Sequence, residues 1–276
     1  MLASRQQDGA GDNIAGSHWV QVAGGQLHVR SVGQGPAVIF LHGWTLDWRI
    51  WLRQIDITGF QLILPDRRGF GRSTAAARLA VEPADICAIA DHFDTLDFAL
   101  IGLSQGAAVA LDTARKHPAR VKALSVIGAP LHHLVPEPAG APEIDREAFA
   151  KLVRAGKLAE MLTQWSRHPL THIAPTGQKL LQDILADYDG RDQLVDQPPL
   201  GFEACEIAAL ALPVLAVAGA QDSDWRIRVA RYIGSHVQHG RTEIIPEAGH
   251  IANVDQAVAV NRLLQDFLNT HYLKEL

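Results

Sequence analysis

The chain has 276 residues, of which 47% are hydrophobic and 20% are charged, and its formal net charge is −5 at pH 7. This composition is typical of a soluble globular protein, and the acidic balance leaves no basic surface for nucleic acid. The two cysteines, Cys87 and Cys205, lie far apart in the sequence, so they indicate neither a disulfide framework nor a zinc site and fit a reducing compartment.

The N-terminal residues 1–17 are rich in Gly, Asp, Gln and Ser and lack the apolar core of a signal peptide. We expect them to form a disordered tail. No apolar run approaches the ~20 residues that cross a bilayer. The sequence therefore predicts a cytoplasmic protein without a membrane partner, in which residues 18–276 form a single domain.

The first half of that domain alternates predicted strands and helices. Residues 19–33 (WVQVAGGQLHVRSVG) predict a hairpin that turns at Gly24 and Gly25. Continuous apolar runs, typical of strands buried on both faces, then alternate with segments of helical periodicity. The predicted strands are 37–43, 60–66, 98–104 and 121–130, and the predicted helices are 80–96 and 105–118. Repeated strand–helix–strand units indicate an α/β fold, with a mostly parallel central sheet flanked by helices.

Residues from about 131 to 205 interrupt this pattern, because they contain no convincing strand. After a proline-rich loop, residues 143–168 predict one or two amphipathic helices and residues 178–195 predict another. The α/β pattern then returns, with predicted strands at 212–219 and 242–249 and predicted helices at 226–237 and 254–273. We interpret residues 131–205 as a short helical cap inserted into the α/β domain, and this cap could carry the interface of a homodimer.

A G-x-S-x-G pattern, formed by residues 102–106 (GLSQG), lies where a predicted strand ends and a predicted helix begins. In that context the pattern is typical of a nucleophile elbow, a sharp and strained turn that presents the serine hydroxyl above the sheet. Side chains two positions before and after the serine would collide, so glycine is required at Gly102 and Gly106. A chance glycine–serine turn is the alternative. We interpret Ser104 as the nucleophile.

A serine hydroxyl needs a base to act as a nucleophile. His250 directly follows the last predicted strand, at the sheet edge where functional groups collect in parallel sheets. The imidazole in turn needs an acid that orients it. Asp222, just past the predicted strand at 212–219, is our choice for this acid, and Asp224 is the competitor. The resulting order, serine then aspartate then histidine, differs from the orders of the chymotrypsin and subtilisin types.

Negative charge that develops on a substrate oxygen needs preorganised N–H donors. We expect one donor to be the backbone N–H of Gln105, at the positive end of the helix that follows the nucleophile. The second donor is expected to be the backbone N–H of Trp44, in the loop after the strand at 37–43.

Three further residues are candidates for the substrate pocket: His42, His132 and Trp165. His42 also fits a role as a brace for its loop, and Trp165 also fits packing within the cap. Adjacent histidines at 132 and 133 cannot readily bind one ion with the geometry that zinc prefers, so no metal site is expected.

Five segments are similar, in order and spacing, to those of the α/β-hydrolase superfamily: LHGW (41–44), PDRRGFGRS (65–73), GLSQG (102–106), AGAQD (218–222) and EAGH (247–250). The resemblance covers nearly the whole chain from about residue 19. HGWTLDWRIW followed by DRRGFGRS most resembles the branch that holds cofactor-free haloperoxidases, aryl esterases and enol-lactonases. The chain departs from that branch at Gln105 and Ala107, where the branch usually has Met, Thr or Leu and a second glycine.

The resemblance implies the α/β-hydrolase fold, with Ser104, Asp222 and His250 as catalytic triad, Trp44 and Gln105 as oxyanion donors, and no cofactor. The predicted function is a serine hydrolase that cleaves a small carboxylic ester or lactone through an acyl-enzyme. Because fold does not fix function, other activities stay open. They are a carbon–carbon bond hydrolase or a perhydrolase with the same triad, a cofactor-independent dioxygenase with a His250–Asp222 dyad, and a low-turnover ligand-binding protein.

Overall fold

The computed structural model describes residues 16–132, 134–137 and 143–273. Within these residues, eight strands form one sheet of order β1-β2-β4-β3-β5-β6-β7-β8. The strands are β1 (Gly16–Val22), β2 (Gly25–Val32), β3 (Ala37–Leu41), β4 (Gln61–Pro65), β5 (Phe98–Leu103), β6 (Val121–Ile127), β7 (Pro213–Gly219) and β8 (His239–Ile245). The pairs β1–β2 and β2–β4 are antiparallel, and the pairs from β4 to β8 are parallel. The predicted α/β fold with a mostly parallel sheet is confirmed.

The N-terminal hairpin is confirmed as β1 and β2, which turn at Gly24 and Gly25 with φ of +81° and +153°. β1 begins at Gly16, so the last two residues of the predicted tail lie in a strand. The rest of that tail, residues 1–15, lies outside the described residues.

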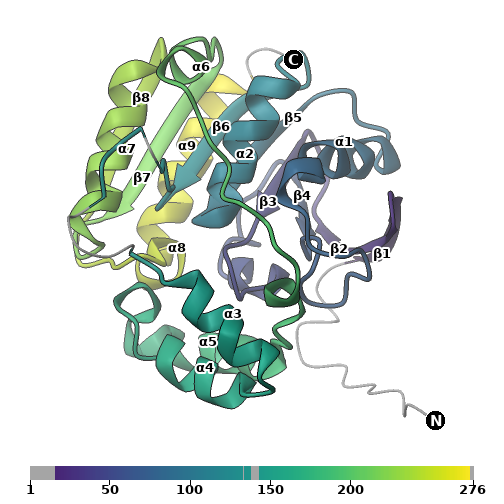
Figure 1. Cartoon of the computed structure of the whole chain (residues 1–276). Coiled ribbons are helices and arrows are strands. Elements are labelled where there is room, and N and C mark those ends of the chain that lie inside the picture. Colours follow the sequence, from purple (N-terminus) through teal and green to yellow (C-terminus); the bar gives the residue numbers. More distant parts are fainter. Residues whose placement is uncertain (1–15, 133, 138–142, 274–276) are drawn as a thin grey trace.

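The sheet is covered by helices on both faces (Figure 1). One face packs against α1 (Glu82–His92), α2 (Gln105–Lys116) and α7 (Asp224–His236), and the other packs against η1 (Trp48–Trp51) and α9 (Ala257–His271). A hydrophobic core lies on each face of the sheet, and successive residues of a buried strand point to opposite cores. In β5, Leu100 packs with α1 and α2, whereas Ile101 packs with α9. This period of two, with both faces apolar, explains the continuous apolar runs of the sequence.

Three of the helices in the chain between β6 and β7, at residues 146–154, 158–165 and 175–187, lie together at one end of the sheet, in the lower part of Figure 1. We call residues 131–205 the cap. The helices that follow β6 are α3 (Arg146–Arg154), α4 (Leu158–Trp165), η3 (Pro169–Thr171), α5 (Pro175–Asp187), η4 (Arg191–Leu194) and α6 (Ala204–Ala208). Two glycines separate these helices: Gly156 adopts φ +73° between α3 and α4, and Gly190 adopts φ +74° before η4. The predicted helix at 178–195 is therefore too long, because a left-handed glycine ends helical geometry.

The C-terminal ends of the parallel strands all point toward the cap end of the sheet, so residues that directly follow these strands meet there. η2 (Leu79–Val81) and α8 (Ala252–Asp255) complete the elements near this edge. No helix within the described ranges 16–132, 134–137 and 143–273 is long and apolar enough to cross a membrane.

Candidate active site

Ser104 occupies a strained turn between β5 and α2, with φ +53° and ψ −119°. A Cβ on Gly102 would lie 2.6 Å from the Cα of Ala107, and a Cβ on Gly106 would lie 2.2 Å from the carbonyl oxygen of Leu41. The two glycines are thus required because α2 begins directly against β5 and β3. The absence of a side chain at both positions allows the close approach that the strained turn at Ser104 requires.

His250 and Asp222 form a buried pair, with His250 Nδ1 2.8 Å from an Asp222 carboxylate oxygen. Burial alone would raise the pKa of Asp222, but the adjacent His250, the Arg226 guanidinium and the Ser223 N–H outweigh it and hold that pKa below its usual value. The competing Asp224 is exposed at the first position of α7. The structure therefore brings Asp222, and not Asp224, to His250.

The tautomer of His250 follows from this contact. An ionised carboxylate only accepts hydrogen bonds, so Nδ1 carries a hydrogen, and in the neutral form of the ring the lone pair is on Nε2. Ser104 and His250 line the same small cavity of about 20 Å³, together with Trp165 from the cap. The Ser104 hydroxyl makes no hydrogen bond to any described residue. The hydrogen bond between a catalytic hydroxyl and its base is often long before substrate binds, and it shortens in the complex.

The loop after β3 runs beside Ser104, since a Cβ on Gly43 would lie 3.3 Å from the Cβ of Ser104. Trp44 follows Gly43 in this loop, and Gln105 is the first residue of α2. Among the described residues, neither backbone N–H has an acceptor. Two donors that belong to different elements therefore remain unpaired next to Ser104.

The cap holds this loop through two tryptophans. The indole N–H of Trp44 donates to Asp192 in η4 at 2.8 Å, and the indole N–H of Trp165 donates to the Thr45 hydroxyl at 2.8 Å. Asp192 also accepts from the Tyr188 hydroxyl at 2.5 Å. Trp165 thus packs within the cap and also lines the small cavity. Asp192 was not predicted, because an isolated aspartate in a helical segment belongs to no recognisable motif.

A larger cavity of about 240 Å³ also borders Ser104, and residues of the cap form part of its lining. Its lining includes Gln105, His132 and Arg146. Burial lowers the pKa of His132 even though Glu137, 2.6 Å from Nδ1, opposes this effect. His133, which the sequence pairs with His132, lies outside the described residues. The volume lies below the usual range of ligand sites, roughly 300–1,000 Å³, so the cavity suits a small substrate.

A still larger depression of about 510 Å³ lies between α2, β6 and α6 and contains none of the predicted site residues. Its position, at the opposite end of β6 from the cap edge, separates it from Ser104. We therefore place the candidate active site at the two cavities that share Ser104.

A model of the alpha/beta hydrolase fold family matches residues 36–257, which is most of the chain. The chain belongs to the α/β-hydrolase family. This α/β hydrolase is 28% identical over 257 residues to the pimeloyl-[acyl-carrier protein] methyl ester esterase of Chromobacterium violaceum, a match that covers 88% of this chain and 98% of that protein. It is 25% identical over 259 residues to 3-oxoadipate enol-lactonase 2 of Acinetobacter baylyi, covering 87% and 91% of the two chains.

The α/β hydrolase spans about a third of the length of some relatives that it matches, such as the epoxide hydrolase of Caballeronia sordidicola, where the match covers 34% of the relative. Among solved structures, the carboxylesterase CesB of Bacillus subtilis has a TM-score of 0.77 at 20% identity, covering 92% of this chain and 91% of that one. At this identity the likeness shows the fold alone. The resemblance read from the five sequence segments is confirmed.

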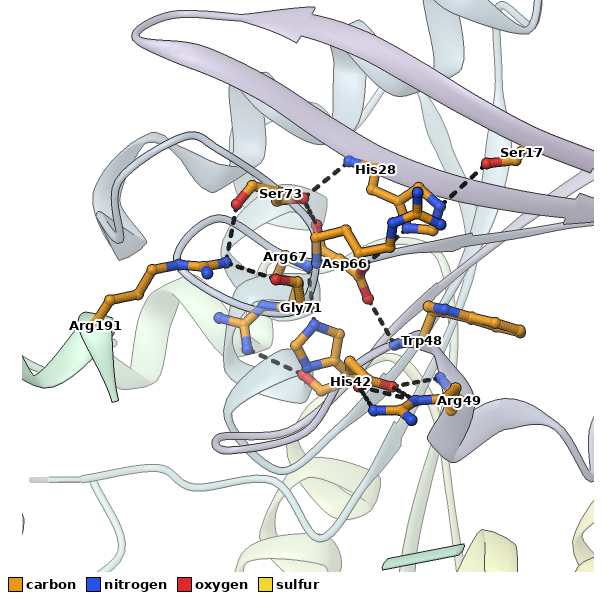
Figure 2. A network of polar contacts seen from close by, with 12 residues as sticks. Ser17, His28, His42, Trp48, Arg49, Asp66, Arg67, Gly71, Ser73 and Arg191 are labelled. Carbon is orange, nitrogen blue, oxygen red and sulfur yellow. Dashed lines mark hydrogen bonds and ion pairs between the residues drawn. The ribbon is translucent and has the colours of Figure 1, made fainter. Parts of the chain in front are cut away.

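His42 lines neither of the two cavities that share Ser104, so its assignment to the substrate pocket is wrong. The side chain is fully buried: Nδ1 lies 2.8 Å from the Gly43 carbonyl oxygen, and Nε2 accepts the Arg67 backbone N–H at 2.9 Å. Burial, and next the charge of Arg67, lower the pKa of His42 to about 3. The neutral ring ties the loop after β3 to the loop after β4, as Figure 2 shows.

Asp66 organises the second of these loops from its centre (Figure 2). Its carboxylate accepts hydrogen bonds from the His28 ring at 2.9 Å, the Trp48 N–H at 3.0 Å and the Arg72 N–H at 2.9 Å. Burial would raise the pKa of Asp66, but His28 and these backbone donors outweigh it and lower the pKa. This carboxylate therefore supports the fold and does not face either cavity.

Arg67 and Arg68 are both buried and each is paired with a carboxylate of α1, Glu82 and Asp85 respectively, at 2.7 Å. These ion pairs occupy both guanidinium groups, so the two arginines form no anion site. Arg67 also donates to the side-chain oxygen of Gln105 at 3.1 Å. The side-chain amide of Gln105 is thereby fixed beside Ser104, while its backbone N–H has no acceptor in the part of the chain that the structure describes.

Proposed function

We propose that this α/β hydrolase cleaves a small carboxylic ester or lactone, with Ser104 as nucleophile, His250 as general base and Asp222 as the acid that orients it. One arrangement carries the proposal. Ser104, in its strained conformation, lines the same cavity as His250. Nδ1 of His250 lies 2.8 Å from the buried Asp222 carboxylate. A nucleophile, a base and an oriented tautomer are the requirements of acyl transfer through serine.

The reaction follows from this arrangement in two halves. His250 Nε2 takes the hydroxyl proton as Ser104 Oγ attacks the carbonyl carbon, and the N–H groups of Trp44 and Gln105 donate to the oxyanion. The intermediate collapses, and the leaving alkoxide takes the proton from His250. Water then attacks the acyl-enzyme, with His250 again accepting a proton, and Ser104 is released with the acid product.

Two relatives that match this chain over most of its length support an acyl–oxygen bond as the target. One is named a methyl ester esterase and the other an enol-lactonase. The cavity of about 240 Å³ beside Ser104 fits a small substrate. The Asp222 carboxylate, with its pKa held below the usual value, stays ionised at neutral pH and can stabilise the imidazolium of the first step.

A fluorophosphonate probe tests the proposal, with intact-mass detection on wild type, Ser104→Ala and His250→Ala. Ser166→Ala is the matched control, because Ser166 is an exposed serine of the cap. We expect one probe per chain in wild type and in Ser166→Ala, and none in the other two variants. Hydrolysis of p-nitrophenyl esters and small lactones should fall by about 10⁴-fold or more in Ser104→Ala.

Absence of labelling in folded wild type would refute the serine mechanism. Oxygen consumption would then be measured, because a cofactor-independent dioxygenase would need only His250 and Asp222 as a base dyad.

A further inference from the structure

Arg146 is a cation of the candidate active site that forms no ion pair with any residue that the structure describes. It is the first residue of α3 in the cap, it is half-buried, and it lines the cavity of about 240 Å³ together with Ser104. Among the described residues its guanidinium makes no hydrogen bond and no ion pair. Its recorded contact is with the ring of Trp44, whose centroid lies 4.4 Å from the guanidinium carbon.

The other charged side chains that line this cavity already have hydrogen-bond or ion-pair partners within the protein. Arg226 forms an ion pair with Glu143 at 2.6 Å and donates to the Gly128 carbonyl at 2.7 Å. Glu137 accepts from His132 and from the backbone N–H of Glu143. The cavity therefore presents one guanidinium whose donors are not used within the described structure.

Asp192 balances the charge of Arg146 only at a distance. The two groups attract each other, but no N–O distance of 4 Å or less joins them. The Asp192 oxygens already accept from Trp44, from Tyr188 and from Gln193. Arg146 thus keeps its five N–H donors for another acceptor.

The surroundings of Arg146 make such an acceptor favourable. Burial, reinforced by Arg226 and Arg67 and opposed by Asp192, lowers the pKa of Arg146 to about 10. A desolvated cation with unused donors is costly, and an anion that accepts hydrogen bonds from it removes that cost. A carboxylate matches the planar fork of a guanidinium with two parallel hydrogen bonds.

We propose that the substrate of this hydrolase carries a carboxylate, apart from the ester or lactone that is cleaved, and that Arg146 binds it. This inference rests on the proposed function of Ser104. One unpaired guanidinium suits a singly charged group. A dianion such as a phosphate monoester would also face Glu137 and Glu143 in the same cavity.

Two p-nitrophenyl esters of equal length test the proposal: the half-ester of glutaric acid, and the corresponding ester with a terminal amide in place of the carboxylate. The ratio of their kcat/KM values would be measured in wild type, Arg146→Met and Arg146→Lys. Arg154→Met is the matched control, because Arg154 is an exposed arginine of the same helix that pairs with Glu147.

We expect wild type to favour the carboxylate ester by about 10- to 100-fold, the range of a charge-assisted hydrogen bond pair. Arg146→Met should lose this preference, Arg146→Lys should keep part of it, and Arg154→Met should keep all of it. A wild type that shows no preference, or an Arg146→Met enzyme that retains it, would overturn the proposal. The ratio is insensitive to a loss of active protein, since both esters report on the same sample.

A binding measurement separates this proposal from the function of Ser104. Glutarate would be titrated calorimetrically into Ser104→Ala and into Ser104→Ala combined with Arg146→Met. We expect Kd to rise about 10- to 100-fold in the double variant. Equal affinity, or no binding to either protein, would count against Arg146, whatever the outcome of the labelling experiment. Binding without labelling would mean that the carboxylate site is right and the serine mechanism is wrong.

Discussion

Replacement of Gly128 by alanine would push directly on the His250–Asp222 pair. Gly128 follows β6 with φ +57°, and an added Cβ would lie 2.7 Å from Cε1 and 2.8 Å from Nδ1 of His250. Neighbours of a Cβ in ordinary contact lie 3.4–4 Å away, so the ring must move by roughly 0.7 Å or more. Nδ1 is the atom that lies 2.8 Å from Asp222, so this movement disturbs the hydrogen bond that sets the tautomer.

Two effects of different kinds follow from this substitution. The left-handed backbone costs alanine about 1–2 kcal/mol of folding free energy. A displacement of about 1 Å at a reacting group can cost about 100-fold in rate, so we expect kcat to fall by about that factor. Gly59→Ala separates the two effects, because Gly59 has φ +81° and its added Cβ meets no atom within 4 Å. That control should lose similar stability and keep its kcat.

The assay combines ester hydrolysis, the rate constant for phosphonate labelling of Ser104, and urea unfolding of both glycine variants. A Gly128→Ala enzyme that is labelled and turns over at the wild-type rate would refute the reasoning, because His250 would then tolerate a displaced position. Equal loss of kcat in Gly59→Ala would also refute it, since backbone strain far from the site would then explain the effect.

Two further predictions concern Asp222 and His42. Asp222→Asn should lower kcat by about 10⁴-fold, because the amide no longer fixes the tautomer of His250. The exposed Asp224→Asn variant should keep its kcat. Similar rates in the two variants would contradict the choice of Asp222. Folding lowers the pKa of His42 to about 3 from 6.5. As the pH falls below 6.5, the unfolded chain therefore takes up a proton before the folded chain does. The contribution of His42 to the free energy of unfolding is thus complete above pH 6.5 and is lost as the pH falls toward 3. Between pH 7.5 and 5.0 this loss amounts to about 2 kcal/mol. Over this interval the free energy of unfolding should therefore fall by about 2 kcal/mol more in wild type than in His42→Asn. An equal fall in the two proteins would show that His42 does not titrate this way.

The sequence was most informative where local chemistry and chain direction act together. Continuous apolar runs predicted strands buried on both faces, and the rule that functional groups follow parallel strands placed Ser104, Asp222 and His250 at one edge. The structure brings His250 and Asp222 within 2.8 Å although 28 positions separate them in the chain. The flanking glycines of Ser104 were also predictable, although the atoms that exclude a side chain belong to the backbone of neighbouring elements.

Contacts made by the cap could not be predicted in the same way. Trp44 and Asp192 are 148 positions apart, and helical periodicity shows which face of a helix is apolar but not which loop it meets. The length of the cap helices was also misjudged near Gly190, because a glycine within an apolar pattern has the same appearance whether it continues a helix or ends it. His42 was ambiguous for a related reason, since only the path of the loop after β4 decides whether its ring is covered.

Trp44 is the residue where the sheet and the cap act on the same group. Its backbone N–H has no acceptor among the described residues, and its indole N–H donates to Asp192. The Arg146 guanidinium carbon lies 4.4 Å from the centroid of its ring. Strand ends of the α/β domain therefore hold the proposed nucleophile and the proposed base, whereas the cap positions one proposed oxyanion donor and supplies the cation proposed to bind the substrate carboxylate. Substitutions in the cap are accordingly expected to change which substrates are used while the chemistry at Ser104 is retained, provided that the hydrogen bonds from the cap to Trp44 and Thr45 stay intact.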